Sequence, residues 1–278
     1  MKKSTLFQAL AGFSIAFTSV LVPPSVKAQA CPAASSIAVA GDGGLSAFNT
    51  ATSGSCSGTP DSYGVTVFKM GLCTSNPSGV VGAAADYSKC SLTFEDSSGS
   101  STSFGAGGSS ALPASLGTRP EDGTYSHAII LLSTDFVIQA EYGPLGDGST
   151  TWYSTGYQTA DTTGPAVSFT APTTTFGGGS GTCEAVASVS GSSGTMTGYI
   201  LDSSEALIAD SSAATCPGAT YILGVVELNS EIEIDSTVTA LSATFSVTDN
   251  GTTIMVNQAG NAIVFDGGPF DVSLSIVR

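Results

Sequence analysis

The chain has 278 residues and a formal net charge of −15, although only 10% of its residues are charged, and glycine alone contributes 34 residues. Nucleic acids and anionic membranes bind clusters of Lys and Arg, so this charge balance excludes both as expected partners. The length suits one large β domain or two smaller ones.

The first 30 residues predict a secretory signal peptide. Lys2 and Lys3 give a charged start, residues 6–22 are apolar, and small residues precede Ala28 and Ala30, after either of which signal peptidase could cut. Removing this segment would leave 4 basic against 22 acidic residues, a net charge of −18. No later apolar run could span a bilayer. We therefore expect a protein that does not span a membrane and is secreted, extracellular or at the cell surface, with the periplasm as an alternative.

Six cysteines lie in the exported part, and an even number in an oxidising compartment predicts three disulfides. Pairing of sequence neighbours is expected because it closes the shortest loops. The predicted pairs are Cys31–Cys56, Cys73–Cys90 and Cys183–Cys216. A lipid anchor on Cys31 is an alternative, but Ala28 stands where a lipobox normally has Leu. A zinc site is disfavoured because there is no C-x-x-C pair and only one histidine.

In the first half of the exported chain, alternation of apolar and polar residues predicts strands. Residues 31–60 are rich in small residues and are expected to wrap the edge of the domain. Strands are predicted at 63–70 and 91–94, and residues 96–110, with little to bury, are predicted to be a mobile loop.

Residues 120–142 predict a turn, a strand from Tyr125, a tight reversal at 133–135 and a second strand from Phe136. The spacing Pro120-x-x-Gly-x-Tyr125 is similar to the turn that precedes a strand in many extracellular β-sandwich modules. That resemblance implies that the Tyr125 hydroxyl bonds back to the turn.

The glycine run at 177–181 is the best candidate for a domain boundary. Beyond it, residues 185–190 and 196–201 predict a hairpin, and 205–210 predict one helical turn, the only helix expected in the exported chain. Further strands are predicted at 221–228, 232–241, 243–247, 254–256, 262–265 and 270–277. The segment Asp249-Asn250-Gly251 is a hairpin signal because Asn-Gly tolerates positive φ angles.

These elements predict an all-β protein, specifically a disulfide-containing β-sandwich of the Greek-key type. Residues 31–176 would form an N-terminal β domain and residues 182–278 a C-terminal one, either as two packed halves or as one continuous sandwich.

No catalytic residues are assigned. A Ser-His-Asp hydrolase would need a nucleophile beside His127, the only imidazole, and that residue falls in the middle of a predicted strand. No G-x-S-x-G elbow is present. We expect His127 to be an ordinary strand histidine, half-buried or at the surface.

Two sets of residues are candidates for binding. Glu231, Glu233 and Asp235 alternate along one strand face and could hold a structural Ca²⁺, although such a face is more often merely solvated; no other cofactor is expected. Trp152, Tyr153 and Tyr157 could form a platform for a sugar ring. The alternative for Trp152 is a place in the core.

The expected function is that of a secreted or cell-surface, non-enzymatic structural or adhesive protein that self-assembles or binds other envelope proteins. One alternative is a carbohydrate-binding module for surface glycans, for which an exposed Trp152 would argue. Another is a secreted glycoside hydrolase, which needs two carboxylates in one cleft. The strand at 270–277 completes its own sheet or that of a neighbouring molecule.

Overall fold

The structure, a computed structural model, describes residues 19–20, 29–105, 109–111, 118–176, 181–191, 194–247, 249, 251–268 and 271–278. It is 50% strand and 6% helix, built of several antiparallel sheets with three disulfides. The predicted all-β class is confirmed, and the sheets are compatible with a β-sandwich. Most of the predicted signal peptide and residues 177–180 of the predicted boundary lie outside the described residues. Among the residues that the structure describes, no helix is long and apolar enough to cross a membrane.

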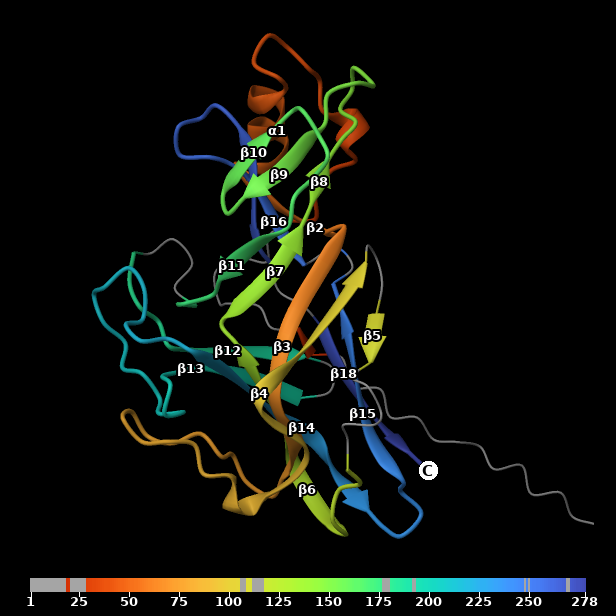
Figure 1. Ribbon diagram of the computed structural model, residues 1–278, viewed down its shortest axis with the longest axis vertical. Helices are drawn as coiled ribbons and strands as arrows, with labels where there is room; N and C mark the ends of the chain where they lie inside the picture. The colour runs from red at the N-terminus through yellow and green to blue at the C-terminus, as the bar shows by residue number, and fades with distance from the viewer. Residues whose placement is uncertain are drawn as a thin grey trace, which may run out of the picture.

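The elements follow in chain order, with the shape of the molecule shown in Figure 1. Up to the glycine run they are β1 (Ser19–Val20), η1 (Ala34–Ser36), α1 (Leu45–Thr52), β2 (Ser55–Gly58), β3 (Ser62–Cys73), η2 (Tyr87–Lys89), β4 (Cys90–Gly105), β5 (Ser109–Ala111), β6 (Gly123–Ser133), β7 (Asp135–Gln139), β8 (Glu141–Tyr142), β9 (Trp152–Gly156), β10 (Thr159–Asp161) and β11 (Phe169–Pro172). After it they are β12 (Val186–Gly191), β13 (Gly194–Leu201), β14 (Tyr221–Ile234), β15 (Ala240–Ser246), β16 (Thr252–Val256), β17 (Ile263–Gly267) and β18 (Asp271–Val277).

The largest sheet has the strand order β11-β7-β3-β6-β14-β13-β12, with β4 on the other edge of β3. Residues 128–132 of β6 are all buried, which indicates a central strand covered on both faces. Strands β6 and β14 pair directly, so segments from before and after the glycine run share one sheet. The predicted hairpin of the second half is confirmed as β12 and β13, with Gly191 opposite Gly194.

The predicted reversal at residues 133–135 is wrong. Val67 of β3 lies opposite Leu132 of β6, and Gly64 lies opposite Val137 of β7 on the same edge, so β6 and β7 run in one direction along β3. The segment has no Gly, Asn or Pro to supply the backbone angles of a tight turn. The pairing with β3 is instead interrupted around Thr134, and the chain continues in the same direction into β7.

The described residues also form three smaller sheets, with the orders β1-β18-β15-β5, β10-β9-β8 and β17-β16-β2. The predicted hairpin across residues 249–251 is wrong, because β15 pairs with β18 and β5 whereas β16 pairs with β17 and β2. Asp249 does have a positive φ of 60°. The turn is therefore present, but it passes the chain from one sheet to another.

The helical and loop predictions also need correction. The only α-helix among the described residues is α1, which buries Leu45, Phe48 and Thr52 at helical spacing. Residues 205–210 form no helical turn; Leu207 makes a β-bridge with Leu201. Most of the predicted loop at 96–110 belongs to the 16-residue strand β4, because residues 100–105, although mostly serine, threonine and glycine, pair with residues 62–67 of β3.

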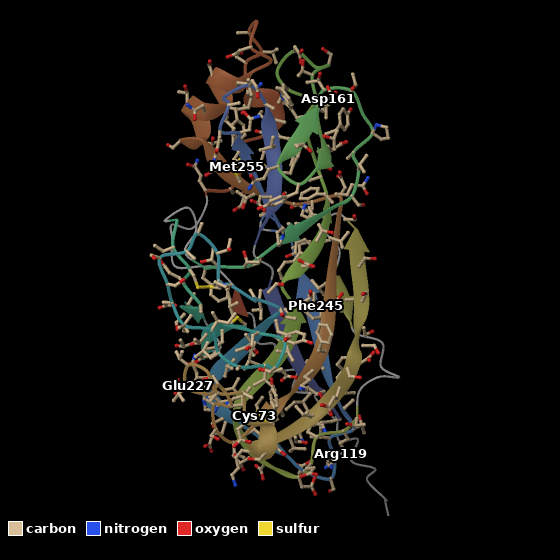
Figure 2. The ribbon with its side chains drawn as sticks, turned by 60° about the vertical axis from the view of Figure 1, so that its left-hand side comes forward. Cys73, Arg119, Asp161, Glu227, Phe245 and Met255 are labelled. Atoms are coloured by element: carbon tan, nitrogen blue, oxygen red, sulfur yellow. A yellow bond between two sulfur atoms is a disulfide. The ribbon has the colours of Figure 1, made fainter. Side chains whose placement is uncertain are left out.

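The six cysteines pair as predicted, Cys31–Cys56, Cys73–Cys90 and Cys183–Cys216. Tyr125 Oη donates to Glu121 O at 2.9 Å, which is the bond back to the turn that the resemblance implied. Figure 2 places Cys73 and Arg119 near one end of the long axis and Asp161 and Met255 near the other, with the buried Phe245 between them.

Candidate functional site

The only histidine lies in β6, where its imidazole is half-buried. His127 Nδ1 is 2.8 Å from Ser126 Oγ, and that hydroxyl also bonds to Thr74 O at 3.0 Å. A carbonyl oxygen can only accept, so both bonds form together only when Ser126 donates to Thr74 and His127 Nδ1–H donates to Ser126. An activated serine needs the opposite arrangement, in which the imidazole accepts the hydroxyl proton. This contact is therefore structural.

Glu227 of β14 lies opposite His127 in the ladder. Burial lowers the pKa of His127, and the negative charge of Glu227 offsets part of that effect. The sequence did not reveal the contact with Ser126, because neighbouring residues of a regular strand point to opposite faces.

The three candidate aromatic residues are not presented together. Trp152 is buried, with 7% of its surface exposed, and its Nε1–H donates to Gly43 O at 3.3 Å. Tyr153 is half-buried, and its ring packs so closely on Gly164 that a Cβ there would lie 2.7 Å away. Tyr157 alone of the three is exposed, at 43%. Trp152 is therefore a core residue that fixes the loop before α1.

Tyr157 belongs to a small polar cluster between the β9–β10 turn and β17. Gln158, with a positive φ of 51°, donates from Nε2 to Asp266 Oδ2 at 2.7 Å, and Tyr157 Oη is 3.4 Å from the same oxygen. Burial raises the pKa of Asp266, while bonds from Gln158, the Gly267 N–H and Tyr157 oppose the rise. Burial and the nearby Asp266 raise the pKa of Tyr157 to about 12.

The acidic strand face follows the expected alternation, but its carboxylates do not converge. Glu231 and Glu233 are exposed on β14, and Ile232 and Ile234, which alternate with them, are buried. Asp235 lies just beyond the strand, where its carboxylate accepts bonds from Thr237. Among the described residues, no group of three or more His, Cys, Asp and Glu side chains could hold a metal ion.

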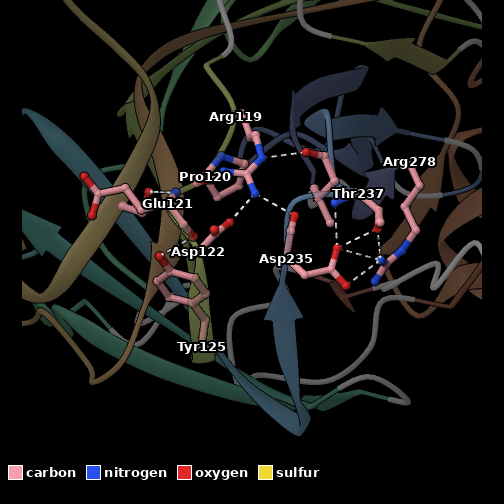
Figure 3. Close-up of polar contacts among 10 residues, drawn as sticks. Arg119, Pro120, Glu121, Asp122, Tyr125, Asp235, Thr237 and Arg278 are labelled. Atoms are coloured by element: carbon pink, nitrogen blue, oxygen red, sulfur yellow. Dashed lines mark hydrogen bonds and ion pairs between the residues drawn. The ribbon is translucent and has the colours of Figure 1, made fainter.

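Asp235 instead belongs to a network around two arginines (Figure 3). Its carboxylate accepts from Thr237 N at 2.8 Å and from Arg278 Nη1 at 3.2 Å. Its carbonyl oxygen accepts from Arg119 Nη2 at 2.6 Å. The bonds from Thr237 are the main reason that the pKa of Asp235 is lowered, with Arg278 contributing further. The network ties the turn before β6 to the end of β14 and to the C-terminal residue.

A second charged cluster, which the sequence did not reveal, surrounds Lys69 of β3. The side chain of Lys69 is only 16% exposed, and its Nζ forms an ion pair with Glu205 and lies 3.9 Å from Glu95 Oε1. Residues 62–73 are otherwise apolar or small, and a lysine in such a strand needs carboxylate partners when it is covered. That rule was a usable signal for a charged site, although it does not identify the partners.

A shallow cleft of about 260 Å³ lies where the segment at Ala30 and Cys31 meets β2 and β8. Its carboxylates are Glu141 and Asp249. Burial raises the pKa of the neighbouring Asp61, and the charge of Glu141 raises it further. The cleft is below the roughly 300–1,000 Å³ of typical ligand pockets.

Comparison with known proteins gives no assignment: no family model, no curated protein and no solved structure matches the chain.

Proposed function

We propose that the chain is an exported, non-enzymatic structural or adhesive protein of the cell surface, which associates with itself or with other envelope components. The observation that carries this proposal is the β3–β4 ladder. Two strands of 12 and 16 residues pair in the middle and lower part of the molecule in Figure 1, running roughly along its long axis. Cys73 and Cys90 lie opposite each other at the end of the ladder and are joined by a disulfide.

Such a ladder suits a protein that bears load. Hydrogen bonds between antiparallel strands are perpendicular to the strands, so a force along the strands strains many of them at once. The disulfides Cys31–Cys56 and Cys183–Cys216 close local loops elsewhere and restrict the unfolded chain. An exported protein, which has no cytoplasmic chaperones to refold it, benefits from both the long ladder and the disulfides.

The test is fractionation of the native culture with an antibody against the protein. We expect it to sediment with the envelope or in filaments, and the purified protein to form oligomers in sedimentation velocity. A protein that stays monomeric, binds no surface and turns over a polysaccharide would overturn the proposal. In that case the cleft carboxylates Glu141 and Asp249 are the first to replace, as Glu141→Gln and Asp249→Asn.

Tyr157 favours one second candidate, the binding of surface glycans. Its exposed ring stands beside the Gln158 amide and the Asp266 carboxylate, a combination that offers a sugar both a flat apolar face and hydrogen-bonding groups. If the ring stacks on a sugar, glycan-array binding survives Tyr157→Phe and is lost in Tyr157→Ala. Equal binding by the two variants would exclude this site.

A further inference from the structure

The Lys69 cluster brings one amine between two carboxyl groups from different elements. Glu205, in the connection between β13 and β14, contacts Lys69 Nζ directly, and Glu95 lies opposite Lys69 in the β3–β4 ladder. The side chains of Lys69 and Glu205 are 16% and 24% exposed, whereas that of Glu95 is 60% exposed. The ion pair of Lys69 and Glu205 is therefore mostly covered, whereas the Glu95 carboxylate keeps access to solvent.

Glu205 is held in place by its backbone. It has a positive φ of 60°, a conformation that disfavours any residue with a Cβ. Its carbonyl accepts from Ala85 N at 3.0 Å, and its N–H donates to Asp202 O at 3.0 Å. The next residues continue this pairing, with Leu207 N donating to Ala83 O. Strained conformations persist where the surroundings fix them, and they concentrate at functional sites.

Tyr87 covers the amine. Its ring centroid is 4.6 Å from Lys69 Nζ. Its buried Oη lies close to the Glu205 carboxylate but is not placed for a regular hydrogen bond. Burial is the main reason that the Tyr87 pKa is raised, and the charges of Glu205 and Glu95 add to the rise. Lys69 and Glu205 thus meet under an aromatic cover that limits the access of water.

We propose that Lys69 and Glu205 condense to an intramolecular amide, with Glu95 carrying the proton. Transfer of one proton within the ion pair gives a neutral amine and a neutral acid. The Nζ lone pair then forms a bond to Glu205 Cδ. Glu95 accepts the remaining surplus proton from nitrogen and returns it to the departing hydroxyl, so that one water molecule leaves. No oxidant, reductant or further reactant is needed.

The fold supplies what this reaction lacks in free solution. A salt bridge is the stable form of an amine and an acid in water, but fixed contact raises the effective concentration of the two groups by roughly 10⁵ M or more. Partial exclusion of water weakens the preference for the charged pair. The resulting bond would join β3 to the β13–β14 connection, 136 residues further along the chain. It would act beside the disulfides as a fourth cross-link that reduction does not open.

The test is mass spectrometry of the purified full chain after denaturation, reduction and alkylation. We expect a mass one water molecule below that of the processed sequence, and a branched peptide that joins Lys69 to Glu205. Peptide mapping removes any ambiguity from the site of leader cleavage. Full calculated mass, with Lys69 recovered as a free amine under denaturing conditions, overturns the proposal.

Variants assign the roles. Glu205→Ala and Lys69→Met should restore the full mass, and Glu95→Gln should leave a large uncondensed fraction that declines slowly with time. Glu233→Gln, an exposed carboxylate on β14, is the matched control and should condense as completely as the parent. Complete condensation in Glu95→Gln would contradict the role given to Glu95. The mass of the parent protein decides the main proposal even if a variant fails to fold.

Discussion

The backbone N–H of Thr134 donates at 3.2 Å to the carbonyl of Thr220, the residue directly before β14. The carbonyl of Thr134 accepts in turn from Thr173 N at 2.8 Å, just after β11. Thr134 therefore links the residue before β14 to the residue after β11. These two hydrogen bonds explain how β6 and β7 remain on one edge of β3 although their other edges face β14 and β11.

Replacing Thr134 by proline should destabilise the fold, because proline has no N–H to donate and the residue is buried. We expect Thr134→Pro to lower the free energy of unfolding by about 2–3 kcal/mol. Thr134→Val keeps the backbone donor and should cost less than about 1.5 kcal/mol. Urea denaturation measures both. Equal losses in the two variants would show that the backbone bond has no special role.

Arg119 should contribute far more to the stability of the fold than an exposed ion pair alone would. Its guanidinium donates to Val238 O at 2.6 Å, Pro120 O at 3.1 Å and Asp235 O, in addition to its ion pair with Asp122 (Figure 3). Arg119→Lys cannot reproduce this fork and should lower the free energy of unfolding by about 2 kcal/mol.

The matched variant is Asp122→Asn, because the Asp122 side chain is 66% exposed. It should cost less than about 1 kcal/mol, as expected for an exposed ion pair. If Asp122→Asn destabilises as much as Arg119→Lys, the carbonyl bonds are not the main contribution.

His127 should make the protein less stable in mild acid. Its pKa in the fold lies below the ordinary value of 6.5, so the unfolded chain binds a proton more readily. The stability that comes from the neutral imidazole is complete above about pH 6.5 and is lost as the pH falls through the folded pKa. His127→Gln should therefore lose less stability than the parent between pH 7 and pH 5. Parallel stability curves for the two proteins would contradict the shift.

The pH dependence of stability that comes from Asp266 should have the opposite sign to that from His127. Burial raises its pKa above the ordinary 3.8, so the folded state favours the neutral acid, and stability falls as the pH rises from about 3.8 through the folded pKa. Asp266→Asn stays neutral and can still accept the Gln158 bond. We expect its midpoint of thermal unfolding to exceed that of the parent at pH 7 and to match it near pH 3. A less stable variant at pH 7 would show that the charge is needed.

Many strands were predictable from the sequence, but apart from the β12–β13 hairpin their partners were not. Alternation located β3, β12, β13 and the buried run of β6, because a covered face requires apolar residues. Pairing depends on contacts between distant segments: β15 and β16 flank a good turn, yet each joins a different sheet. In β4, serines and glycines gave no apolar signal, although the backbone completes a ladder.

The sequence does carry a signal for the helix α1. Leu45 and Phe48 are buried at a spacing of three residues, and the Asp42 carboxylate accepts from Ser46 N at 2.9 Å in the first turn. For the sites, the alternation of Glu231 and Glu233 along a strand was predictable, but Asp235 lies just beyond β14. The partners of Asp235 and Trp152 were not predictable. The contacts of Lys69 with Glu205 and of Trp152 with Gly43 join residues more than 100 positions apart, a separation that no local pattern encodes.

The most direct test of a structural role at the cell surface is where the native protein is found. In a fractionated culture, we expect the mature chain in the envelope pellet or in sedimenting assemblies, retained after a salt wash. Recovery of all of it as free monomer in the medium would contradict that role.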